Sequence, residues 1–243
     1  MSGALLRRRR TIIAMAAGGG SGGGAKAFVQ KTTLNASTGV TTQTTTLTGA
    51  TAHNLLIALS TWDMNAGSGN PTINASSTGW QQAVQAGPVV SSNNGAWITG
   101  ASIFYKQDAA AGSNALQLDF ANTARVQTII IEVSGNTTSG SLDKLSSSTT
   151  TSAATVTATT AATTWATEIV VAVNAAQFVG SNSNIGMTDP ATGLSVSIAV
   201  NQDTNTYAAH ESSYKIVSAT GTQSASWSWT GASESAAAIA TFM

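Results

Sequence analysis

YKQDAAAGSNALQLDF at residues 105–120 and YKIVSATGTQSASWSW at residues 214–229 are two versions of one pattern, separated by 109 residues. Both begin with Tyr-Lys, place a glycine seven residues later, and end on large apolar residues at alternate positions. Upstream, LLIAL at 55–59 is matched by IVVAV at 169–173, at a separation of 114 residues. Matches at nearly constant separation predict that the chain contains two copies of one unit.

Each copy has the pattern of an all-β protein. Leu116, Leu118 and Phe120 alternate with Gln117 and Asp119, so one face of that strand is buried. Similar short runs lie between clusters of Gly, Asn, Ser and Pro, and no stretch has a helical period. We expect two tandem, internally duplicated antiparallel β-sandwiches of about seven strands each, either separate or merged into one. The expected strands are 40–48, 54–62, 71–75, 79–85, 97–107, 114–120 and 126–134, then 154–159, 167–174, 184–188, 193–200, 206–217, 222–229 and 235–242.

The composition indicates a globular body with a nearly uncharged surface. The chain has 243 residues, of which 42% are hydrophobic, enough for a sizeable core. Charged residues make up only 8%, so hydroxyl and amide groups must cover most of the exterior. Weak charge repulsion favours association, and we expect a homo-oligomer. The absence of cysteine excludes disulfides and thiolate metal sites.

The charges are divided between a basic arm and an acidic body. Arg7, Arg8, Arg9, Arg10, Lys26 and Lys31 are the only charged residues among the first 31, while the rest of the chain has four basic and ten acidic residues. A Gly/Ser tract at 18–24 predicts a flexible joint. We expect a basic arm at 1–27, a first sandwich at 28–140 and a second at 141–243, with the six cations anchoring the chain to a partner.

The arm has two other interpretations. Four consecutive arginines suit nucleic acid, but no second basic patch extends the footprint, so we do not expect nucleic acid as the partner. Residues 11–17, TIIAMAA, are too short to span a membrane. After the arginines they resemble the apolar part of a signal peptide, with cleavage after Ala27. The alternative to an anchoring arm is therefore a secreted protein.

No residue pattern indicates catalysis, a metal or a cofactor. His53 and His210 have no second ligand at a metal-type spacing. His210 lies beside Glu211 in an expected strand, where the pattern predicts a solvent-facing pair. We therefore expect a protein that is not an enzyme.

Several aromatic side chains are candidates for contact with a sugar, because pyranose rings stack on aromatic faces. They are Trp62, Trp80, Trp97 and Tyr207, with Trp165 as a further candidate. Trp62 is the strongest, since it precedes a Gly/Asn-rich loop. Packing in a core or an interface is the alternative role for each of them.

The pattern as a whole resembles a group of bacterial and bacteriophage β-sandwich proteins. The segments that carry the resemblance are HNLLIALSTWD (53–63), SIFYKQDAAAGSNALQLDF (102–120), IIIEVSG (129–135), EIVVAVNAA (168–176), SSYKIVSATGTQSASWSW (212–229) and AAAIATF (236–242). The resemblance covers about residues 40–243 and carries no functional residue over.

The resemblance implies a structural module of a virus particle, associated with its tail, fibres or capsid. We expect a virion protein that is attached through its arm to other virion proteins and exposes its sandwiches for assembly, with a host-surface glycan as a further partner. The alternative is a secreted carbohydrate-binding or adhesion module, released by cleavage of a signal peptide.

Overall fold

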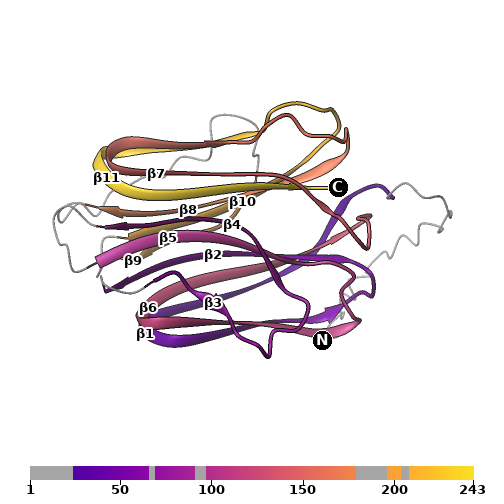
Figure 1. The fold of residues 1–243 in the computed structure, drawn as a ribbon, viewed down its shortest axis with the longest axis horizontal. Helices are drawn as coiled ribbons and strands as arrows, with labels where there is room; N and C mark the ends of the chain where they lie inside the picture. Colours follow the sequence, from indigo (N-terminus) through magenta and orange to yellow (C-terminus); the bar gives the residue numbers. More distant parts are fainter. Residues whose placement is uncertain (1–23, 66–68, 91–96, 179–195, 204–207) are drawn as a thin grey trace, which may run out of the picture.

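The computed structural model describes residues 24–65, 69–90, 97–178, 196–203 and 208–243, and these contain strands and no helix (Figure 1). The expectation of an all-β chain is confirmed. Eleven strands are present in these ranges: β1 (Ala27–Ala50), β2 (Leu55–Asn65), β3 (Thr72–Ile73), β4 (Gln81–Val90), β5 (Trp97–Lys106), β6 (Gly112–Ser134), β7 (Leu142–Thr159), β8 (Glu168–Phe178), β9 (Val196–Asp203), β10 (Ala208–Val217) and β11 (Ser224–Phe242).

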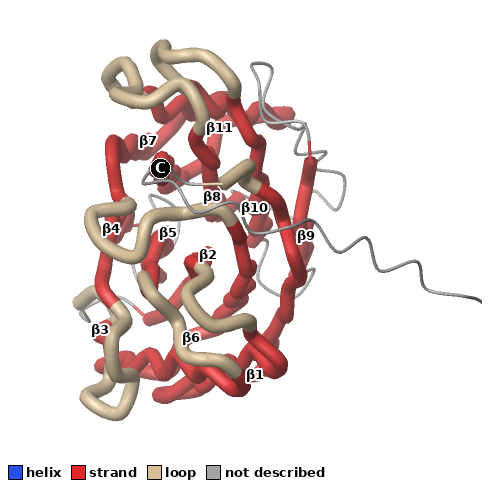
Figure 2. Tube along the Cα trace, turned by 90° about the vertical axis from the view of Figure 1, so that its right-hand side faces the viewer, coloured by secondary structure: helices blue, strands red, loops and turns tan. Residues whose placement is uncertain are grey.

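The strands form two antiparallel sheets, one from each half of the chain. The first sheet has the order β1-β6-β2-β5-β4, with β3 paired to β6, and the second has the order β7-β11-β8-β10-β9. Apart from β3, the two orders correspond strand by strand along the chain. The edge strands β4 and β9 lie on opposite sides of the molecule (Figure 2).

The pairing registers of the two sheets also correspond. In the first sheet Glu132 lies between Gln30 of β1 and Leu56 of β2. In the second sheet Thr241 lies between Lys144 of β7 and Val170 of β8. These positions are related by the separations of 114 and 109 residues found in the sequence. Both β4–β5 and β9–β10 contain a register shift, at Gln82/Val84 and at Ser212/Ser213.

Each half encloses a core of its own because its two longest strands bend. The pairing of β1 with β6 shifts register between Ala36 and Thr42, and that of β11 with β7 shifts between Ser228 and Ser235. Beyond each bend the strand pair covers the outer face of its own sheet (Figure 1). The first-half core includes Leu116, Leu118, Leu56, Phe104 and Trp62. The second-half core includes Val156, Val170, Trp227, Trp229 and Ile239.

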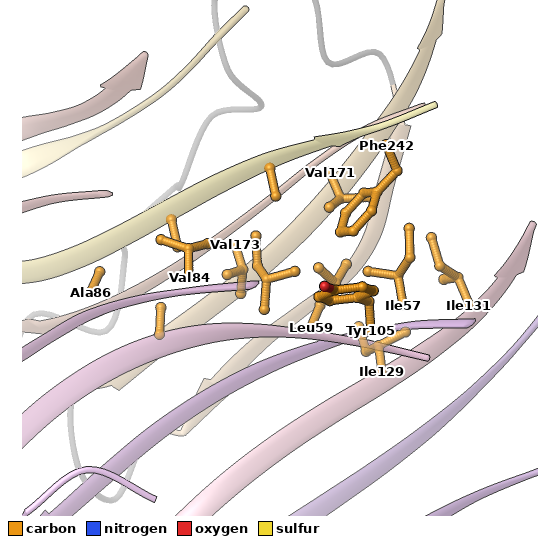
Figure 3. Close-up of a cluster of buried hydrophobic side chains, with 14 of the residues drawn as sticks. Ile57, Leu59, Val84, Ala86, Tyr105, Ile129, Ile131, Val171, Val173 and Phe242 are labelled. Carbon is orange, nitrogen blue, oxygen red and sulfur yellow. The ribbon is translucent and has the colours of Figure 1, made fainter. Parts of the chain in front are cut away.

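A third core lies between the two sheets and joins the halves. This shared core contains Ile57, Leu59, Tyr105, Ile129 and Ile131 from the first sheet and Val171, Val173 and Phe242 from the second (Figure 3). The ring of Phe28 stacks on Tyr214 at 5.1 Å, and Tyr105 meets Phe242 at 5.4 Å. Burial of each large side chain contributes roughly 1.5–3 kcal/mol, so the interface between the halves is strongly stabilised. The two sheets therefore pack face to face through a common core.

The expected strand count differs from the structure because neighbouring strands are continuous. The expected strands 114–120 and 126–134 are both parts of β6, and 222–229 and 235–242 are both parts of β11. Among the described residues the first sheet consequently has six strands, and the second has five because the expected strand 184–188 also falls outside those residues. Asn122 and Thr123 at the bend favour a turn by their composition, yet the backbone remains extended through them.

The sequence pattern does not predict the start of β1 or most of β7. Residues 27–39 and 142–153 lie in strands with little apolar alternation. Both are edge strands that pair with one neighbour only, so hydroxyl residues can occupy most of their positions. The expected strand 184–188 lies outside the described residues.

Candidate functional site

The predicted anchoring residues fall only partly within the described ranges. Arg7, Arg8, Arg9 and Arg10 lie outside them. Lys31 is an exposed residue of β1. The Nζ atom of Lys26 donates a hydrogen bond to the carbonyl oxygen of Gly135 at 3.1 Å. Burial lowers the pKa of Lys26, and attraction to Glu168 opposes that shift. Lys26 thus binds the residue that follows the end of β6.

Two of the predicted sugar-contact residues are not at the surface. Trp62 is 0% exposed, and Trp80 is 6% exposed with its indole N–H donated to the carbonyl oxygen of Ala115. Neither ring presents a face on which a sugar could stack, so the alternative of core packing holds for both. Tyr207 lies outside the described residues. Trp165 is 53% exposed.

Trp97 belongs to a charged cluster at one end of the shared core. Its ring lies 5.1 Å from the guanidinium carbon of Arg125, a cation–π contact. An Arg125 nitrogen lies 3.7 Å from Asp63, and the other Asp63 oxygen lies 3.4 Å from Nε2 of His210. Asp63 and Arg125 come from the first sheet and His210 from the second. The cluster therefore joins the two halves where the apolar core ends.

The inner part of this cluster is buried, while the side chain of Arg125 is 23% exposed. Asp63 is 0% exposed and His210 is 4% exposed, so the interpretation of His210 and Glu211 as a solvent-facing pair is wrong; Glu211 is buried as well. Breaking a buried ion pair by removing one partner is strongly destabilising, which is consistent with a structural role. One signal in the sequence points to the burial of Asp63: it continues the inward-facing series Leu55, Ile57, Leu59 at alternate positions.

The other histidine has a local role. His53 adopts a left-handed backbone conformation with φ of 67° in the turn before β2. Its Nδ1 atom lies 2.6 Å from Oδ1 of Asp108, and both side chains are exposed. The pair joins two neighbouring turns, those between β1 and β2 and between β5 and β6.

A buried carboxylate closes the turn between β1 and β2. Glu132 of β6 accepts hydrogen bonds from the backbone N–H of Thr51 at 2.8 Å, from the Asn54 amide at 2.6 Å and from the Gln30 amide at 2.6 Å. Burial alone would raise the pKa of Glu132, but these donors outweigh it and lower the pKa. Glu132 is therefore held ionised. We call Glu132 and its three donors, on Thr51, Asn54 and Gln30, the turn latch.

The corresponding place in the second half holds two carboxyl groups. Asp143 of β7 accepts hydrogen bonds from the Thr164 N–H and hydroxyl, both at 2.6 Å, and from Nζ of Lys144 at 2.7 Å. Glu168, the first residue of β8, accepts the N–H of Trp165 at 3.1 Å, and burial together with the neighbouring Asp143 raises the pKa of Glu168. Of these two carboxyl groups, Glu168 acts on Lys26, whose pKa it raises against the effect of burial.

Among the described residues, two outer strands, β1 and β7, expose rows of hydroxyl groups. On β1, Thr42, Thr44 and Thr46 are exposed while Gln43, Thr45 and Leu47 between them are buried. On β7, the exposed hydroxyls of Thr157 and Thr159 each pair at 2.8 Å with a serine hydroxyl of β11. These faces can donate and accept hydrogen bonds without presenting a strong charge.

Comparison with known proteins finds no match to a protein-family model, a curated protein or a solved structure. Within the described ranges no three His, Asp or Glu side chains are grouped as metal ligands. In that same part of the chain no helix is long and apolar enough to cross a membrane.

Proposed function

We propose that the two halves are copies of one β-sheet unit that pack into a single body. The matching strand order, the matching registers around Glu132 and Thr241 and the shared register shift beside β5 and β10 support a common origin. The copies diverged at the turn latch. The carboxylate of the first half is Glu132 on β6, whereas the second half has Asp143 on β7 and Glu168 on β8. Duplication supplies a rigid body with two similar outer faces.

We propose that this body is a non-enzymatic structural protein of a bacteriophage particle. The observation that carries the proposal is the contrast between the interior, in which Trp62, Trp80 and most of the charged cluster are buried, and the rows of hydroxyl groups exposed on β1 and β7. Such a molecule acts through contact with neighbours. The resemblance of its segments to virion-associated sandwiches, and the concentration of basic residues in the first 31, support attachment within a particle.

The arm and the outer faces have separate roles in this proposal. Arg7–Arg10 attach the chain to an acidic surface of a neighbouring virion protein, since opposite charges steer association. The hydroxyl faces contact further copies of the chain or a neutral glycan at the host surface. An uncharged face adds little repulsion when copies assemble.

Mass spectrometry of gradient-purified particles tests the proposal. The chain is expected in the particles at a fixed copy number, with a peptide that retains Arg7–Arg10. Replacement of the four arginines by serine in the full-length chain is expected to abolish incorporation while leaving the circular dichroism spectrum unchanged; Lys106→Ser on β5 is the matched control. A chain that is missing from particles and is recovered from the medium beginning after Ala27 would instead support a secreted carbohydrate-binding module.

A further inference from the structure

Trp165 is the one exposed aromatic residue among the side chains that the structure describes. It lies in the connection between β7 and β8, residues 160–167, which we call the Trp165 turn. The other described tryptophans are buried or half-buried, whereas Trp165 is 53% exposed. Large aromatic rings mostly belong in cores or interfaces, so a ring on the surface is a candidate for contact with a partner.

Hydrogen bonds on both sides of the ring hold the turn in place. Thr164 donates its N–H and its hydroxyl to Asp143, both at 2.6 Å. The Thr164 hydroxyl also accepts a hydrogen bond from Nζ of Lys144 at 2.7 Å. The N–H of Trp165 itself is donated to Glu168 at 3.1 Å. The backbone that carries the ring is therefore fixed before a partner binds, which reduces the entropy lost on binding.

The first half has the same fastening without the ring. Thr51 and Thr164 both donate their backbone N–H to a carboxylate, at 2.8 Å in the first half and 2.6 Å in the second. The residue that follows is Ala52 in the first half and Trp165 in the second, and both are exposed. A turn fastened in this way thus forms with an alanine at this position. The ring of Trp165 is not needed to build the turn and is available for another role.

The surroundings of the ring favour a neutral partner. Residues 160–167 have the sequence TAATTWAT, so the neighbours of Trp165 in the turn are alanine and threonine. Lys144, which is bonded to the turn, forms an ion pair with Asp143 at 2.7 Å. The turn offers no second large apolar side chain, and protein interfaces are centred on clusters of such residues. A small, neutral ligand fits this turn better than a protein surface.

A sugar ring has the chemistry that complements this site. Tryptophan presents a flat apolar face and an indole N–H donor. The C–H face of a pyranose can pack on the aromatic ring while the sugar hydroxyls donate and accept hydrogen bonds. Exposed hydroxyl residues flank the turn along the chain, with Thr157 and Thr159 on β7 before it and Thr167 at its end.

We propose that Trp165 binds a neutral carbohydrate, with one pyranose ring stacked on its indole face. Because hydrogen bonds fix the turn, the site is present in the free protein. This inference goes beyond the proposed function, which names no residue for contact with a glycan. It applies to a particle component and to a secreted chain alike, so it stands or falls separately from the virion proposal.

Binding of the full-length chain to neutral and charged oligosaccharides, in about 0.5 M salt so that the arginines are screened, tests the proposal. The neutral probes are tetrasaccharides of glucose, galactose, mannose and N-acetylglucosamine, of which at least one is expected to bind. In a nitrogen-15 NMR titration with that tetrasaccharide, the indole N–H signal of Trp165, assigned by its loss in Trp165→Tyr, is expected to shift. The signals of the buried Trp62 and Trp227 are expected to stay in place.

Trp165→Ala is expected to weaken binding by at least about tenfold. Its circular dichroism spectrum and urea midpoint should match the wild type, because Ala52 occupies the same position in the first half. Trp165→Tyr keeps an aromatic face and should retain part of the affinity. Leu145→Ala removes another exposed apolar side chain outside the turn, so it is the matched control and should bind like the wild type.

Failure of every neutral tetrasaccharide to bind would overturn the proposal. Binding to charged oligosaccharides alone would overturn it as well, because it would assign the contact to the arginines. Equal losses of affinity in Trp165→Ala and Leu145→Ala would show that any exposed apolar side chain suffices. If Trp165→Ala does not fold, the NMR titration decides, and a Trp165 signal that stays in place while the sugar binds contradicts the proposal.

Discussion

Gly100→Ala is expected to lower the free energy of unfolding by at least about 3 kcal/mol, because the new methyl group would overlap a ring that cannot move. A Cβ at Gly100 on β5 would lie 2.1 Å from a ring carbon of Trp62. Trp62 is fully buried in the first-half core, so it has no free space to enter. Urea unfolding followed by circular dichroism measures the effect.

A matched control and a double variant separate this clash from a general effect of alanine. A Cβ at Gly69 would meet no atom within 4 Å, and Gly69 has no left-handed φ, so Gly69→Ala should change stability little. Trp62→Leu removes the overlapping ring, and we expect Gly100→Ala to cost much less in that background. Additive losses in the double variant would show that an alanine at position 100 and Trp62 are not in steric conflict.

Glu132→Gln is expected to destabilise the protein by about 2–3 kcal/mol at neutral pH, because one donor of the turn latch would face an amide N–H₂. Thr51 and Asn54 share one carboxylate oxygen and Gln30 binds the other, so neither orientation of a glutamine satisfies all three donors. Urea unfolding at neutral pH measures the loss, and wild-type stability in the variant would mean that the latch contributes nothing.

The latch also predicts how stability depends on pH. The folded pKa of Glu132 is lowered, so its contribution is present above the unfolded value and is lost as the pH falls through the lowered folded value. The Glu132→Gln variant should therefore lose less stability on acidification than the wild type. Glu168→Gln is the matched comparison in the second sheet: burial raises the folded pKa of Glu168, so its contribution is lost as the pH rises through that raised value, and the variant should lose less stability than the wild type over that rise.

Much of the fold could be predicted from the sequence because alternation and internal repetition are local signals. The run from Leu116 to Phe120 indicates which face is buried, and the matched Tyr105 and Tyr214 do lie toward the shared core. The packing of the two sheets against each other could not be predicted, because no sequence pattern states which inward faces meet. The stacking of Phe28 on Tyr214 depends on that choice.

The candidate sites were harder to predict for the same reason. The Gly/Asn-rich loop after Trp62 favours a surface position for that ring, yet Gly100 on the neighbouring strand leaves room for it inside the core. Asp63 and His210 are distant in sequence and meet only because the sheets face each other. The carboxyl pair depends on a turn that brings Thr164 back to Asp143.

Hydrogen exchange in Gly100→Ala, read separately for the two sheets, tests most directly whether the halves form one body. Gly100 lies in the first sheet. Because the two sheets share a core, the destabilisation caused by Gly100→Ala should also lower the stability of the second sheet. The most protected amides of β8 and β11 should therefore lose the same free energy of opening as those of β2 and β6. Wild-type protection of β8 and β11, with losses confined to the first sheet, would contradict a single body built on a shared core.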